Sequence, residues 1–121
     1  MFIHIFGFRW LGRATDEDKA RAAREIRAFQ GTIPGLIDVA VGENLSPRGQ
    51  GYTFTGLMRF EDRAACDAYA PHPLHVALLE WLVPLIEPVE LDFEACWYPP
   101  LKSRRDGAPG TGLFVPDNDS R

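Results

Sequence analysis

Two histidines and a tyrosine lie close together in segment 67–76 of the chain, which reads DAYAPHPLHV. Tyr69, His72 and His75 carry side chains of the types that give or take protons in acid–base chemistry. Pro73 lacks a backbone donor and fixes its own φ, so it favours the first turn of a new helix. The positive end of that helix disfavours a protonated imidazole at His75. His75 is therefore predicted to be neutral and able to accept a proton.

The same residues also have a purely structural interpretation. Tyr69 precedes His75 by six residues across a helix break, so the turn between the helices decides whether the two side chains meet. His72 is expected to cap the new helix and to face solvent, while Tyr69 and His75 could simply pack the junction. No metal site is expected, because His72 and His75 span a helix start and lack a third ligand at a set spacing.

Length and charge narrow the class of protein. The chain has 121 residues and a net charge of −4, so one domain is expected and a nucleic-acid partner is not. No apolar run is long enough to span a bilayer, so no membrane partner is expected. Cys66 and Cys96 are too few for a disulfide framework, and with no signal-peptide pattern they predict reduced thiols in a cytoplasmic protein.

Short alternating and helical patterns predict the elements that position these residues. Strand 2–9 places four large side chains on one buried face, namely Phe2, His4, Phe6 and Phe8. Thr15, followed by three acidic residues, predicts a helix N-cap. Segment 89–97 alternates apolar with acidic residues, which gives it an acidic face. The predicted strands are 2–9, 36–42, 52–60 and 89–97, and the predicted helices are 16–30, 61–69 and 73–83.

This order of elements predicts an α+β fold, the ferredoxin-like split β-α-β unit with an antiparallel four-stranded sheet. Helices cover only one face of such a sheet. Ile3, Ile5, Leu57 and either Leu36 or Ile37 are expected on faces that this chain's own helices cannot all cover, so a second copy of the chain is the expected partner. Residues 1–98 form the predicted domain, and residues 99–121 form a tail rich in proline, glycine and charged residues.

Several short motifs point to a known family when they are taken together. They are His4-Ile5 with Phe8, Ile33-Pro34-Gly35, Gly42-Glu43-Asn44, Ser46-Pro47-Arg48-Gly49, Gly51-Tyr52-Thr53, and Tyr69 followed by segment 72–76. Over about residues 2–97 the chain resembles the stress-responsive A/B barrel family of the dimeric α+β barrel superfamily. The resemblance implies two ferredoxin-like chains packed sheet to sheet as a homodimeric barrel.

Within that family, the chain is similar to plant polyketide cyclases of the olivetolic acid cyclase type. These enzymes close a linear poly-β-keto chain by intramolecular aldol condensation without metal or organic cofactor. The resemblance implies that His75 is the catalytic base, Tyr69 its partner and His4 a pocket histidine. Phe54 stands where the cyclases carry a histidine and Ile26 where they carry a tyrosine, so a less polar pocket and a different substrate are expected.

Two functions follow as hypotheses. The first is a cofactor-free enzyme, related to a cyclase, lyase or isomerase, that acts on a small apolar carbonyl or aromatic ligand. Its catalytic residues would be His75 and Tyr69, and its pocket would be lined by His4, Phe6, Phe54, Ile26 and Trp81. The second is a non-catalytic stress-response or ligand-binding barrel, in which the same residues only pack. A closed apolar cavity that reaches both His75 and Tyr69 would favour the first. Arg48 either meets a substrate anion or lies in a solvated turn.

Overall fold

Residues 1–97, which the computed structural model describes, form four strands, three α-helices and one short 3₁₀ turn. The predicted tail, residues 99–121, lies outside this range. In chain order the elements are β1 (Phe2–Trp10), α1 (Asp16–Arg27), β2 (Leu36–Glu43), β3 (Phe54–Phe60), α2 (Arg63–Tyr69), α3 (Pro73–Leu82), η1 (Val83–Leu85) and β4 (Ile86–Glu94).

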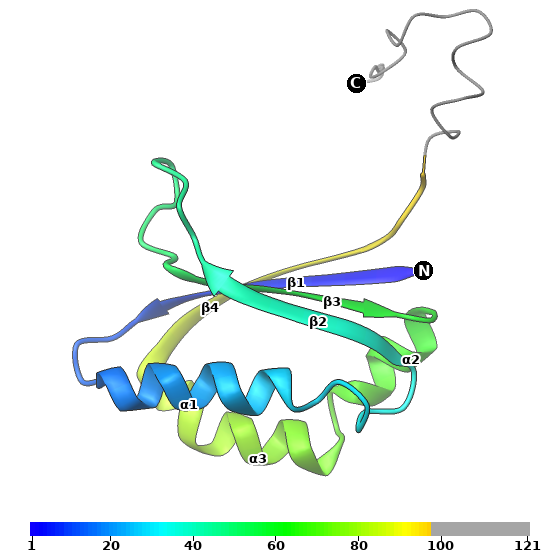
Figure 1. The fold of residues 1–121 in the computed structure, drawn as a ribbon, viewed down its shortest axis with the longest axis horizontal. Helices are drawn as coiled ribbons and strands as arrows, with labels where there is room; N and C mark the ends of the chain where they lie inside the picture. The colour runs from blue at the N-terminus through cyan, green and yellow to red at the C-terminus, as the bar shows by residue number, and fades with distance from the viewer. Residues whose placement is uncertain (98–121) are drawn as a thin grey trace, which may run out of the picture.

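The four strands form one antiparallel sheet in the order β2-β3-β1-β4. The three helices all lie on the same side of this sheet, and the other side carries no helix (Figure 1). This is the α+β, ferredoxin-like arrangement that the order of elements predicted, and the prediction is confirmed. We call the side of the sheet that the helices cover the helix face, and the side without helices the open face.

Capping residues fix where the helices begin. Thr15 accepts a hydrogen bond from the backbone of Asp18 at 3.0 Å, and the Asp18 carboxylate accepts one from the backbone of Thr15 at 2.9 Å. This reciprocal pair satisfies two donors at the start of α1, as the sequence predicted. At α3, Nδ1 of His72 accepts from the backbone of Leu74 at 3.1 Å, with Pro73 in the first turn. His72 is the N-cap as predicted, but it is half-buried rather than facing solvent.

Several predicted boundaries were wrong by one to three residues, including the start of α2, which is Arg63 instead of residue 61. α1 ends at Arg27 instead of residue 30, and β3 begins at Phe54 instead of residue 52. β4 runs from Ile86 to Glu94, whereas 89–97 was predicted. It begins early because Ile86 pairs with Trp10 of β1, a long-range contact that local sequence does not show. Pro88 is tolerated inside β4 because β4 is an edge strand, where a missing donor costs little.

The hydrophobic core lies between the helix face and the helices. The four predicted side chains of β1, namely Phe2, His4, Phe6 and Phe8, are all buried on this face. The three phenylalanines pack in one cluster with residues that include Ile26 of α1, Phe60 of β3 and Leu82 of α3. The period-2 pattern of β1 therefore predicted the buried face correctly.

The open face is apolar and much of it is exposed. Leu91 is 60% exposed, and it lies directly across from Ile5 of β1. The sequence left open whether Leu36 or Ile37 is the residue that the helices do not cover. A bulge in β2 decides between them, because Leu36 joins the core while Ile37 stays 41% exposed. Ile3 differs from expectation: it is only 4% exposed within one chain, beside Phe93 and Trp97.

Gly56 of β3 lies under the ring of Phe6, and the close approach requires a glycine. A Cβ at this position would lie 2.1 Å from Cζ of Phe6, whose ring is buried and cannot easily move. We expect Gly56→Ala to lower the free energy of unfolding by about 1–3 kcal/mol through overpacking, as measured by urea denaturation. Gly42→Ala is the matched control, because a Cβ there meets nothing within 4 Å. Equal stability of the two variants would contradict this packing.

Candidate functional site

The turn between α2 and α3 brings Tyr69 and His75 together. Tyr69 is the last residue of α2, and its carbonyl accepts a hydrogen bond from the backbone of His72 at 3.0 Å. α3 begins at once with Pro73, so His75 falls in its first turn. The centroids of the Tyr69 and His75 rings are 4.2 Å apart. The two side chains that the sequence singled out are therefore in contact.

A backbone carbonyl fixes the tautomer of His75. Its Nδ1 lies 2.9 Å from the carbonyl oxygen of Ala70, the C-cap residue of α2. Because a carbonyl oxygen can only accept a hydrogen bond, Nδ1 is the nitrogen that carries the proton. In the neutral ring this leaves the lone pair on Nε2. His75 thus has the form of imidazole that can take up a proton.

Tyr69 is a buried phenol among aromatic rings. Its side chain packs against Phe29 and Phe60, and the residue is only 6% exposed. Within residues 1–97 its hydroxyl makes no hydrogen bond. Burial, with a smaller contribution from the negative charge of Glu90, raises the pKa of Tyr69 well above its usual range. The phenol therefore stays protonated and can donate a hydrogen bond to a developing negative charge.

His4 of β1 completes the group. Its ring lies 6.2 Å from that of Tyr69 and 5.6 Å from that of Phe6, measured between centroids. Its Nδ1 lies 2.5 Å from Oδ1 of Asp92, on the neighbouring strand β4. The sheet and the helix junction thus place four of the predicted site residues side by side, namely His4, Phe6, Tyr69 and His75.

The other predicted pocket residues lie elsewhere. Ile26 is 1% exposed and belongs to the core. Phe54 stacks on Phe8, with ring centroids 5.2 Å apart. Trp81 of α3 is half-buried against the core, and its indole N–H donates to Oε1 of Glu25 of α1 at 3.1 Å while the Arg21 guanidinium covers its ring. Ile26 shares this core cluster with Tyr69, whereas among the described residues the rings of Phe54 and Trp81 are not paired with those of Tyr69 or His75.

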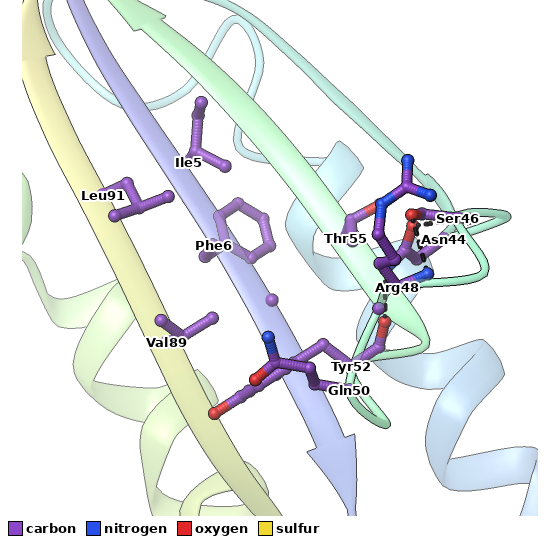
Figure 2. A pocket seen from close by; sticks show the side chains of 12 residues that line it. Ile5, Phe6, Asn44, Ser46, Arg48, Gln50, Tyr52, Thr55, Val89 and Leu91 are labelled. Atoms are coloured by element: carbon purple, nitrogen blue, oxygen red, sulfur yellow. Dashed lines mark hydrogen bonds between the residues drawn. The ribbon is translucent and has the colours of Figure 1, made fainter.

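Two hollows, each of about 360–370 Å³, lie away from the His75–Tyr69 pair. One is on the open face, where Ile5, Val89 and Leu91 form an apolar floor beside the loop that carries Asn44, Ser46 and Arg48 (Figure 2). The other lies between α1 and the β2–β3 hairpin and includes Phe54. Neither hollow is lined by Tyr69 or His75. Arg48 is exposed at the rim of the first hollow.

Cys66 of α2 lies close enough to the site to need a test as a nucleophile. Burial, together with the nearby charges of Asp92, Asp67 and Glu90, raises the pKa of its thiol to about 11. Since the thiolate is the reactive form, we expect iodoacetamide at about pH 8 to alkylate Cys66 roughly 10²-fold more slowly than an ordinary thiol. Mass spectrometry can follow both cysteines, with exposed Cys96 as the internal control. Equal alkylation rates at Cys66 and Cys96 would contradict the raised pKa of the Cys66 thiol.

Sequence reasoning missed Asp92 as a neighbour of His4. The sequence did indicate acidic side chains in this strand, because segment 89–97 was predicted to have an acidic face. Only the register of β1 against β4 shows that this acidic face is the helix face, with Asp92 opposite His4. Alternation within one strand cannot specify which residue lies across from it.

Between residues 1 and 97, no group of three or more His, Cys, Asp or Glu side chains is arranged to hold a metal ion. No helix in the same range has both the length and the apolar character needed to cross a membrane.

Solved structures with the same fold come from plants and bacteria. A protein from Arabidopsis thaliana is 18% identical with a TM-score of 0.74, and the match covers 82% of this chain and 99% of that chain. A hydroxynitrile lyase from Passiflora edulis is 17% identical with a TM-score of 0.73, covering 82% and 96%. A dimeric ferredoxin-like protein from Thermobifida fusca is 25% identical with a TM-score of 0.68, covering 78% and 90%. No curated protein matched the chain.

The sequence also matches a family model directly. The model is that of the stress responsive A/B barrel domain, and the match covers residues 3–95, which include His4, Tyr69, His75 and Asp92. This range is most of the chain, and it agrees with the ferredoxin-like sheet and its single layer of helices. The chain therefore belongs to the family of stress-responsive A/B barrel domains.

Proposed function

We propose that this protein is a homodimeric enzyme that performs cofactor-free acid–base chemistry on a small carbonyl substrate. His75 is the base and Tyr69 the hydrogen-bond donor, while His4 and Phe6 line the site. The single observation that carries the proposal is the contact between the His75 ring, whose Nδ1 is held by Ala70, and the buried phenol of Tyr69. That residues 1–98 form the domain and that the protein is cytoplasmic remain predictions from the sequence.

The two groups match the two needs of an aldol cyclisation. Nε2 of His75 takes a proton from the carbon next to a carbonyl, and the electron pair moves onto the carbonyl oxygen as an enolate. The enolate carbon then bonds to a second carbonyl carbon, whose oxygen becomes an alkoxide. The imidazolium returns the proton to that alkoxide, so His75 ends as it began. Tyr69 donates a hydrogen bond to the oxygen on which charge develops.

The comparisons support the proposal at the level of the fold. The hydroxynitrile lyase from Passiflora edulis is an enzyme with this fold, at 17% identity. A base and a hydrogen-bond donor at this site are suited to proton transfer coupled to the making or breaking of a carbon–carbon bond. The protein from Thermobifida fusca is described as dimeric, which supports a second copy as the cover of the open face.

The test is a turnover assay of the full chain with two probes of different chemistry. One is a linear poly-β-keto thioester, followed by the appearance of an aromatic ring. The other is mandelonitrile, an aromatic hydroxynitrile, followed by release of benzaldehyde. Turnover of either probe that depends on His75 supports the proposal. Turnover of neither probe, or turnover independent of His75, contradicts it for these substrates.

A second candidate function is favoured by the filling of the interior. Phe6 packs onto Gly56, Phe8 stacks on Phe54, and Trp10 meets Phe54 edge to face, so these aromatic rings pack against one another and against the sheet. A non-catalytic barrel of the stress-response or ligand-binding kind would need only this packing. Isothermal titration with the same two probes separates the candidates, because a binding protein would retain the probe without turning it over.

A further inference from the structure

Buried His4 and partly exposed Asp92 form a hydrogen-bonded pair for which the proposed chemistry has no use so far. They lie directly opposite each other on β1 and β4, so both side chains project from the same face of the sheet. Nδ1 of His4 and Oδ1 of Asp92 are 2.5 Å apart. His4 is 8% exposed and is the one polar residue among the buried residues of the described chain.

The carboxylate decides which nitrogen of His4 carries the proton. An ionised carboxylate only accepts hydrogen bonds, so Nδ1 is the donor. In the neutral ring the lone pair is then on Nε2, on the side of the imidazole away from Asp92. β4 is the edge of the sheet, and the other ring neighbours of His4 are Phe6 and Tyr69. The available acceptor of His4 is therefore turned away from the strand edge.

We infer that Asp92 is a positioning residue that holds His4 in the tautomer able to accept a proton beside Tyr69. The inference rests on the proposed function and extends it. The site then contains two imidazoles, each with Nδ1 bound to a fixed acceptor, and Tyr69 lies next to both. One imidazole can then take the proton from carbon while the other gives a proton to oxygen. The two proton transfers can therefore use different nitrogen atoms.

The other charged groups of this region do not take the place of Asp92. Glu90 lies opposite Phe6 and Glu94 opposite Phe2, each one step along the same face of β4. Glu94 is bound to the amino group of Met1 at 2.8 Å, and Asp67 lies 3.8 Å from Arg63. Among these carboxylates of the described chain, only Asp92 is hydrogen-bonded to His4.

The tautomer of His4 can be read without any substrate. In the ¹⁵N-labelled full chain, long-range ¹H–¹⁵N spectra should show His4 protonated at Nδ1. Asp92→Asn replaces an acceptor by an amide that can donate to Nδ1, so we expect His4 to shift to the tautomer protonated at Nε2. Glu90→Gln is the matched control: it removes the same charge from the same face of β4 and should leave His4 unchanged.

Kinetics then separate positioning from a purely structural role. With whichever probe the wild type turns over, we expect Asp92→Asn to lower kcat roughly 10- to 100-fold, with KM little changed, which is less than the loss of an acid–base group itself. An unchanged His4 tautomer in Asp92→Asn overturns the inference, and so does a changed tautomer with unchanged kcat. The spectra decide the inference by themselves if no probe is turned over or if His75→Ala shows the proposed function to be wrong.

Discussion

Replacing His75 with alanine is expected to lower kcat for the carbonyl probe by roughly 10²–10⁴-fold, the usual loss when a positioned acid–base group is removed. The reason is the geometry of the helix junction. The carbonyl oxygen of Ala70 binds Nδ1 of His75, the ring lies 4.2 Å from that of Tyr69, and the other histidine at the start of α3, His72, uses its Nδ1 to cap the helix. Circular dichroism and light scattering should show that fold and assembly are retained, because His75 is half-buried and outside the core cluster.

His72→Ala is the control for this experiment. His72 caps the same helix, so its loss costs about 0.5–2 kcal/mol of stability, yet its Nδ1 is bound to the backbone of Leu74 and turnover should change little. Tyr69→Phe should lower kcat as well, since it removes the buried hydroxyl and keeps the ring. The two substitutions together should cost less than the product of their separate effects, because the pair acts as a unit. Full activity of His75→Ala would favour the non-catalytic barrel.

Leu91→Arg is expected to convert the proposed homodimer into a monomer. Leu91 lies on the open face and is 60% exposed in one chain, across from Ile5. In a two-fold dimer built on this face each substitution occurs twice, and an unpaired buried charge costs several kcal/mol. The dissociation constant should therefore rise by roughly 10²-fold or more, measured by analytical ultracentrifugation at micromolar concentration.

The matched control for the interface is Leu74→Arg. Leu74 is 42% exposed on α3, which lies on the helix face, so the same change of side chain should leave the dimer intact. A wild-type chain that sediments as a monomer would contradict the predicted dimer. A Leu91→Arg variant that stays dimeric while Leu74→Arg dissociates would place the interface elsewhere than on the open face.

The sequence by itself determined most of the fold, because the signals that specify it are local. Thr15 and Asp18 cap α1, Pro73 starts α3, and the alternation of β1 selects its buried face. Each depends on residues only a few positions apart in the chain. The same local logic placed His75 in the first turn of a helix and Tyr69 at the end of the one before it.

Only the tertiary structure decided which side chains share the site. The contact of Tyr69 with His75 depends on the angle of the α2–α3 turn, and the pairing of His4 with Asp92 depends on the register of two strands 88 residues apart. It also gave Phe54 and Trp81 other partners, because Phe54 stacks on Phe8 and the indole of Trp81 donates to Glu25. Residue types and spacing along one strand or helix limit what a side chain can do. The residue that lies across from it is set by long-range pairing and core packing, which have no local signature in the sequence.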